Sequence, residues 1–417
     1  MRTLLLLLML GVPAHAQVHG HASVMLDAVP NVDAAEMRTR FFAERTLQPH
    51  PNLTVNLGGF IEGLVAYRED RVRSDAIVRP QELFVELAGS RGDLRVGMGR
   101  LVWGRLDEVQ PSDVVNPLDV ARFFFEGRAE ARLPVAFARA RFFFPGETTL
   151  ETVVVPWFRR GRFDEIGERF SPFNLEPRQF PIERTPPPVT ARNVQAGARL
   201  SSTMGHIDWA VAAFRGTRPF PLFELVPPRP GVSPQAELVA QGFNVASLRE
   251  HFGRFTMLAA DFETTYGAWG LRGEAAAFVD DDLQTDQLRT IRGRSLDGGV
   301  GFDRKAGAFT MMGTLLIRRQ FSDEDTLDRM NVSIVGGATR SFMRETRTLR
   351  LFSVYDTSDR SVFIRGIAAF SLRDNVSLEG SAGWFVVDED HIRPSTMSLI
   401  SRFAERDFLY ARFKFFF

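Results

Sequence analysis

The C-terminal stretch Asp407–Phe417 reads DFLYARFKFFF and alternates between two kinds of side chain. Its odd-numbered positions are apolar from Leu409 onward: Leu409, Ala411, Phe413, Phe415 and Phe417. Its even-numbered positions include the polar or charged residues Tyr410, Arg412 and Lys414. Because successive side chains of a β-strand point to opposite faces, this period of two predicts a strand with one apolar and one charged face.

The same alternation recurs along the chain. It is clear in Leu53–Ala66, Val78–Ala88, Ala268–Val279, Ala308–Arg319 and Val376–Val387. In a soluble β-sandwich the apolar faces would form the core, whereas in a membrane barrel they would meet lipid and the charged faces would line a lumen. Periodicity alone leaves both architectures open.

The N-terminal residues read as a secretory signal peptide. Met1-Arg2 supplies a positive start, Thr3–Val12 is an apolar run, and Pro13–Ala16 ends in an A-x-A cleavage site. The run is too short for a transmembrane helix, and no later stretch approaches about 20 continuous apolar residues. We therefore expect residues 1–16 to be removed and residues 17–417 to form one exported domain that crosses any membrane with strands.

Three features favour a membrane barrel: the signal peptide, strands of about 10 to 12 residues, and Phe417 at the end of an aromatic strand. The final strand resembles the closing strand of bacterial outer-membrane barrels, whose terminal Phe marks them for insertion. This resemblance implies outer-membrane lipid and the barrel assembly machinery as partners. The expected fold is all-β, a transmembrane antiparallel β-barrel of about 16–18 strands, closed because open edges leave backbone groups unpaired in hydrocarbon.

Connections between the expected strands alternate in length. Short links such as Ser90–Gly92 and Pro145–Gly146 are predicted to be periplasmic turns, and the longer links are predicted to be outer loops. The expected long links are Arg68–Ile77, Gly104–Leu133, Arg159–Val189, Gly216–Gly253, Asp280–Arg294, Phe321–Met330 and Asp388–Arg406.

The segment Trp103–Asp119 (WGRLDEVQPSDVVNPLD) reads as a structured loop because it is rich in Pro, Asp and Asn. It resembles a motif of an uncharacterised family of bacterial outer-membrane, porin-like proteins, a domain of unknown function. That resemblance implies a large barrel with a loop folded inward. Two interpretations of residues 104–133 stay open: a constriction loop inside the pore, or a self-capping outer loop. The candidate loop residues are Trp103, Asp107, Asp113, Asn116, Pro117 and Asp119.

Charged residues on the predicted inner face form a second candidate site. Rings of fixed charge can select ions by sign, and guanidinium groups bind carboxylates or phosphates in two places. Since both signs occur, paired structural ladders across strands are the alternative to a selective eyelet. The candidates are Arg38, Arg40, Glu62, Glu82, Glu86, Arg139, Arg141, Glu151, Asp261, Glu263, Arg272, Glu274, Arg365, Glu379 and Arg412.

Composition argues against several other classes of protein. The chain has no Cys, which excludes disulfides and thiolate metal sites, and its 51 basic and 51 acidic residues give no excess of positive charge for nucleic acid. The acidic runs Asp280–Asp282 and Asp323–Asp325 lack the spacing of a known calcium loop. We expect no metal, no other cofactor and no enzymatic activity, since nucleophile elbows and phosphate-binding loops are missing from the sequence.

Together these features predict an outer-membrane channel for passive diffusion of small polar or amphiphilic solutes, with a preference for anionic solutes as a finer hypothesis. One alternative is a plugged structural or assembly barrel of the cell envelope, with its lumen filled by the Trp103–Leu133 and Gly216–Gly253 loops. A lipid-modifying enzyme at the barrel rim is the least supported alternative. The sequence leaves the solute and the oligomeric state open.

Overall fold

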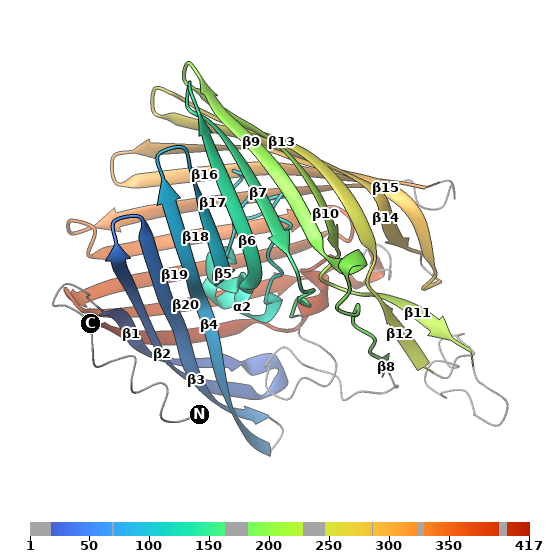
Figure 1. Ribbon diagram of the computed structural model, residues 1–417. Coiled ribbons are helices and arrows are strands. Elements are labelled where there is room, and N and C mark those ends of the chain that lie inside the picture. The colour runs from blue at the N-terminus through green and yellow to red at the C-terminus, as the bar shows by residue number, and fades with distance from the viewer. Residues whose placement is uncertain are drawn as a thin grey trace, which may run out of the picture.

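Eighteen strands close into one antiparallel barrel in the computed structural model of the chain (Figure 1). Each barrel strand pairs with the barrel strand that follows it in the sequence. The last strand, β21 (Phe408–Phe416), pairs with the first, β1 (Val18–Val29), and closes the barrel. Closure removes the free sheet edges that would leave backbone groups unpaired in hydrocarbon. The predicted fold class, an all-β barrel of 16–18 strands, is confirmed.

The structure describes residues 18–68, 71–162, 182–227, 247–285, 287–322, 329–391 and 398–417. The predicted signal peptide, residues 1–16, and the acidic run Asp323–Asp325 lie outside these ranges. Between β1 and β21 the barrel strands are β2 (Ala34–His50), β3 (Leu53–Arg68), β4 (Arg71–Gly89), β5 (Gly92–Gly99), β6 (Val135–Phe144), β7 (Thr148–Val155), β9 (Gln195–Met204), β10 (Ile207–Thr217), β13 (Arg254–Tyr266), β14 (Trp269–Gln284), β15 (Thr290–Ala306), β16 (Phe309–Phe321), β17 (Arg329–Phe342), β18 (Arg347–Asp356), β19 (Ser361–Arg373) and β20 (Val376–Val386).

The outward face of the barrel is apolar, as the alternating pattern predicted. On β16, the side chains of Phe309, Met311, Leu315 and Ile317 remain 40% to 46% exposed, whereas the inward Thr314 is only 6% exposed. Soluble monomers rarely expose a continuous apolar band of this kind, which is the lipid-facing surface of a membrane barrel. The charged face of each strand therefore lines the interior.

The tight turns lie at one end of the barrel and the longer connections at the other (Figure 1). Two of the predicted long links are wrong. Residues Arg68–Ile77 are mostly strand because β4 begins at Arg71, and Asp280–Arg294 is shortened because β14 continues to Gln284 and β15 begins at Thr290. These strand ends are rich in polar residues, so they lack the apolar alternation by which a half-buried strand is recognised.

Shorter elements occupy the connections. The strands β8 (Ile182–Glu183), β11 (Leu222–Val226) and β12 (Ser247–His251) form a separate three-stranded sheet at the loop end (Figure 1). The helices are α2 (Val120–Glu126) and α3 (Arg128–Ala131), with 3-10 turns η1 (Pro30–Val32), η2 (Ala191–Asn193), η4 (Glu389–His391) and η5 (Ser401–Phe403). Within the described ranges, no helix combines the length and hydropathy needed to cross a membrane.

The connection between β5 and β6 packs against the inner face of the barrel. Trp103 and Val115 from its first half join an apolar cluster with residues of β6, β7, β10, β13 and β14. Phe124 and Phe125 of α2 join a second cluster with residues of β1, β2, β19, β20 and β21. The inner face is therefore apolar where this connection packs and charged elsewhere.

Candidate functional site

The connection from Arg100 to Pro134 crosses the interior of the barrel. Backbone amides of Arg105 and Leu106 donate to the Glu274 carboxylate of β14 over 2.9 and 3.2 Å. Further along, the carbonyl of Phe125 accepts a hydrogen bond of 2.8 Å from Arg365 of β19. Since β5, β14 and β19 are well separated around the wall, only a segment inside the barrel can reach all three (Figure 1).

Asn116 holds the two ends of this connection together. Its side-chain oxygen accepts from the Leu101 amide at 2.7 Å, and its side-chain nitrogen donates to the Leu133 carbonyl at 2.7 Å and the Gly99 carbonyl at 3.2 Å. The neighbouring Pro117 carbonyl accepts from the Leu133 amide at 2.7 Å. The predicted turn residues therefore join the place where the chain leaves β5 to the place where it enters β6.

Asp113 and Trp103 anchor the first half of the connection. Asp113 is an ion-pair partner of Arg132 at 2.8 Å and of Arg128 at 3.1 Å. The indole nitrogen of Trp103 donates to Glu151 of β7 at 2.7 Å, and the ring is only 1% exposed. A buried indole needs such a partner for its N–H group, and Glu151 supplies it from the wall.

Wall carboxylates on β13 and β14 hold the same stretch from the other side. The Arg105 guanidinium donates to Asp261 at 2.7 Å and to Glu263 at 3.1 Å. Glu274 accepts from both the amide and the hydroxyl of Ser112, over 2.6 and 2.7 Å. These three predicted inner-face residues thus contact the loop directly.

The other predicted inner-face charges pair along the wall or with the loop. Pairs of this kind satisfy charges that would otherwise be costly to bury, and they fix the positions of the side chains. They are Glu82 with Arg100, Glu86 with Arg95 and Arg139, Arg141 with Asp93, Arg272 with Asp107 and Glu263, and Glu379 with Arg412 and Tyr410.

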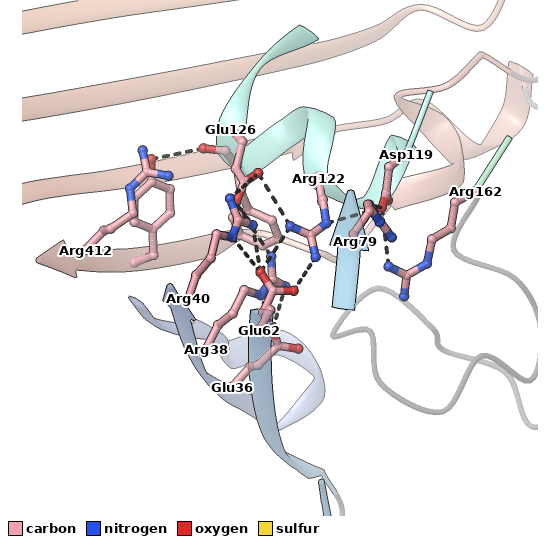
Figure 2. A network of polar contacts seen from close by, with 12 residues as sticks. Glu36, Arg38, Arg40, Glu62, Arg79, Asp119, Arg122, Glu126, Arg162 and Arg412 are labelled. Carbon is pink, nitrogen blue, oxygen red and sulfur yellow. Dashed lines mark hydrogen bonds and ion pairs between the residues drawn. The ribbon is translucent and has the colours of Figure 1, made fainter. Parts of the chain in front are cut away.

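Figure 2 shows a dense polar network where α2 meets β2 and β3. Glu62 of β3 pairs with Arg122 of α2 and accepts from Arg40 of β2 at 2.8 Å. Arg40 also donates to Glu126 at 2.7 Å, and Arg38 lies 3.9 Å from the same carboxylate. Burial would raise the pKa of Glu126, but the guanidinium groups of Arg40 and Arg122 outweigh it and hold that pKa below its usual range. The network thus keeps α2 attached to the wall through full charges.

Asp119 connects the start of α2 to three arginines (Figure 2). Its carboxylate is completely buried and lies 3.4 Å from Arg79, 3.2 Å from Arg122 and 3.3 Å from Arg162. Its backbone amide donates to the Ala131 carbonyl at 2.7 Å. Asp119 therefore joins three parts of the protein: Arg79 of β4, Arg122 of α2, and Arg162 in the connection that follows β7.

A cavity of about 190 Å³ remains between α2 and the wall formed by β18–β21. Arg350 of β18 and Glu108 of the loop both line it, together with the rings of Phe123 and Phe352. Neither charged side chain has an ion-pair or hydrogen-bond partner among the described residues. Burial raises the pKa of Glu108, while the nearby charge of Arg350 opposes that rise. Glu126, Arg365, Glu379 and Arg412 also line the cavity, and each already has a partner in the loop or the wall. The groups left for a solute are therefore one guanidinium, one carboxylate and aromatic surface.

Sequence reasoning missed several contributors to this site. Arg122 and Glu126 are four residues apart and share one face of α2, a spacing that could have indicated their pairing with the wall. Arg105 lies inside the quoted motif but was not singled out, although it binds two wall carboxylates. Arg79 and Glu108 gave no signal, because their neighbours come from distant parts of the chain.

Comparisons with known proteins agree with this architecture. A model of the family described as "Protein of unknown function (DUF1302)" matches residues 47–413. The structure is similar to OccAB1 of Acinetobacter baumannii, with a TM-score of 0.54 and 6% identity over 96% of this chain and 95% of that one. It is also similar to a BenF-like porin from Pseudomonas fluorescens Pf-5, with a TM-score of 0.54 and 10% identity over 98% and 99%.

A third similar structure is Pseudomonas aeruginosa OccK2 (OpdF) in complex with glucuronate, with a TM-score of 0.52 and 10% identity over 96% of this chain and 95% of that one. No curated protein matches the chain in sequence. At these identities the likeness establishes the fold, that of outer-membrane porins. Together with the lipid-facing apolar band, this fold places the protein in the bacterial outer membrane, as the sequence predicted.

Proposed function

The chain belongs to the DUF1302 family, whose function is unknown, and we propose that it forms a channel for passive diffusion of small polar or amphiphilic solutes across the outer membrane. One observation carries the proposal: residues 104–133 cross the lumen and are tied to β14 on one side and β19 on the other. A segment held in this way narrows the path through a barrel, which makes it the constriction of the channel. The inner-face charges named from the sequence then act as its lining.

We further propose that solutes carrying a carboxylate are favoured. Most inner-face charges neutralise one another in pairs, so they contribute little net preference, whereas the Arg350 guanidinium lines the cavity with no ion-pair or hydrogen-bond partner among the described residues. Glu108 lines the same cavity, but burial raises the pKa of its carboxyl group, which weakens the negative charge that would oppose Arg350. A guanidinium binds a carboxylate through two parallel hydrogen bonds. The complex of OccK2 (OpdF) with glucuronate, a sugar carboxylate, is consistent with such a preference in a barrel of the same fold.

Liposome swelling with the purified protein tests the channel. We expect vesicles containing the barrel to swell in solutions of small sugars and organic acids, at a rate that falls as solute size increases. Folded barrel in the vesicles without any solute flux would reject an open channel.

Reversal potentials in a salt gradient test the preference for anions. We expect an anion-selective potential in the wild type and a shift toward cation selectivity in Arg350→Gln, because the unpaired positive charge in the cavity is lost. The matched control is Arg91→Gln, which changes an exposed arginine in the turn between β4 and β5. Cation selectivity in the wild type, or equal shifts in both variants, would contradict the proposed preference.

A plugged structural barrel is the second candidate. It is favoured by the two apolar clusters that pack the connection against opposite parts of the wall, since a loop so firmly packed could close the lumen. The same swelling experiment separates the two functions, because a plugged barrel conducts no solute whatever its size.

A further inference from the structure

A groove of about 580 Å³ indents the outward face of β17–β20. The register places Ala338, Leu351, Gly366 and Ala382 side by side in one row across these four strands. Leu351 is 55% exposed, so the row belongs to the lipid-facing surface. Three of these four residues, Ala338, Gly366 and Ala382, have small side chains or none, which leaves the groove between the larger apolar side chains around it. Part of a membrane molecule must occupy the groove, because an empty groove loses dispersion contacts.

Arginine closes one end of this groove. The Arg340 guanidinium lies 4.8 Å from the centre of the Phe309 ring and 4.5 Å from that of Phe342, with all three side chains at the groove. On the neighbouring strands, Arg304 lies 4.9 Å from the ring centre of Trp269, and Arg347 pairs in register with Phe342. None of these three arginines forms an ion pair with any residue that the structure describes.

The height of these arginines on the barrel identifies the membrane surface they face. Arg304 lies just before the turn that joins β15 to β16, and Arg340 and Arg347 flank the turn that joins β17 to β18. Tight turns mark the periplasmic end of such barrels. Outward-facing arginines among aromatic residues at that level lie at the depth of lipid headgroups, where a guanidinium can reach phosphate instead of hydrocarbon.

We propose that this surface is a binding site for an anionic phospholipid of the periplasmic leaflet, with its phosphate on Arg340 and one acyl chain in the groove. The guanidinium fork matches phosphate geometry, and the aromatic rings on either side hold the fork in place. The groove begins at Arg340 and continues toward the membrane centre over Ala338 and Gly366, which is the direction an acyl chain takes from its headgroup. A second copy of the chain fits this surface less well, because its Arg304, Arg340 and Arg347 lie at the same depth in the membrane and would repel those of the first copy.

Lipid retention measured by native mass spectrometry tests the site. Purified barrel is mixed with phosphatidylglycerol or with phosphatidylcholine of identical acyl chains. We expect preferential retention of phosphatidylglycerol by the wild type, and about tenfold weaker retention by Arg340→Gln, as the loss of a charge-assisted hydrogen bond implies. Arg91→Gln, on the distant turn between β4 and β5, is the matched control and should bind as the wild type does.

A second variant, Gly366→Leu, tests the groove separately from the charge. A Cβ atom at Gly366 would meet no other heavy atom within 4 Å, so the larger side chain can enter the groove without a clash and the barrel should fold normally. We expect this variant to lose phosphatidylglycerol as well. Equal retention of both lipids by the wild type, unchanged retention in either variant, or a lipid-free dimer that Gly366→Leu abolishes would each overturn the proposal.

Discussion

Glu62 shows how single residues hold the internal loop. Its side chain is only 1% exposed and pairs with Arg122 of α2 as well as with Arg40. Glu62→Gln would remove one of the carboxylates that pair with the Arg122 guanidinium, whose side chain is only 4% exposed. We expect the free energy of unfolding to fall by about 3–5 kcal/mol, the cost of breaking a buried pair from one side.

Urea unfolding in lipid vesicles measures this change. Glu147→Gln, in the exposed turn between β6 and β7, provides the matched control, and it should alter stability by no more than about 0.5 kcal/mol. If the two variants were equally stable, Glu62 would have no special role in fixing the loop.

His251 makes the outer three-stranded sheet sensitive to pH. Its Nε2 lies 2.7 Å from Asp282, and this hydrogen bond, opposed by burial, raises the pKa of His251 above 6.5. A raised folded pKa means that the interaction stabilises the sheet fully below the unfolded value and is lost as the pH rises through the folded value. We expect a protease to cleave β11–β12 more slowly at about pH 6 than at about pH 8.

The variant His251→Gln corrects for the protease's own pH dependence. The ratio of wild-type to variant cleavage rates should rise with pH, since only the wild type loses an interaction. A ratio that stays constant between the two pH values would show that the His251–Asp282 contact does not stabilise the sheet.

For single residues, the sequence indicates which face of a strand a side chain lies on, but not which other residues that side chain contacts. Parity placed charged residues such as Glu274 and Arg365 on the inner face, because a strand's side chains alternate regardless of what surrounds them. It could not show that Glu274 binds Ser112, since the two are far apart in sequence and meet only when the loop enters the barrel. Such contacts depend on the path of a connection, for which periodicity gives no information.

The helix α2 is the element that attaches the loop to the far wall. Phe124 packs its ring against those of Phe363, Phe385 and Phe403, with centroid distances of 5.0, 5.1 and 4.7 Å. We expect Phe124→Ala to weaken this attachment by about 3–5 kcal/mol, the usual cost of removing a buried aromatic ring. The loop should then become accessible to a protease added from outside, while the barrel stays folded.

Phe144→Ala serves as the control for that experiment, because Phe144 lies at the turn end of β6 and is 50% exposed. Its cleavage pattern should match that of the wild type. Protection of residues 104–133 in Phe124→Ala would mean that the ion pairs hold α2 without its aromatic contacts.

Strands were predicted better than connections at the element scale. Alternation located the membrane-facing parts of β3, β14, β16, β20 and β21, since lipid and lumen impose opposite demands on neighbouring residues. It missed the polar first part of β4, which begins at Arg71. There the strand extends beyond the membrane, so neither of its faces has to be apolar. The helix α2 has only seven residues, too few for a helical period to stand out, and tertiary contacts hold it in place. Its one usable signal was the spacing of Arg122 and Glu126.

The whole molecule combines a lipid-facing barrel with an internal segment that is bonded to separate parts of its wall. The fold class and the outer-membrane location follow from sequence patterns, whereas only the contacts of Arg105 with Glu274 and of Phe125 with Arg365 show that residues 104–133 run inward. The function of the molecule depends on whether this segment narrows an open path or closes it.

Single-channel conductance in planar bilayers shows whether residues 104–133 narrow an open channel. The wild type is compared with a variant in which residues 105–131 are replaced by a short Gly-Ser linker that leaves β5 and β6 intact. We expect small, discrete conductance steps for the wild type and clearly larger steps for the variant, because the constriction is removed. Identical steps in both proteins, or no current from the folded wild type, would contradict this expectation.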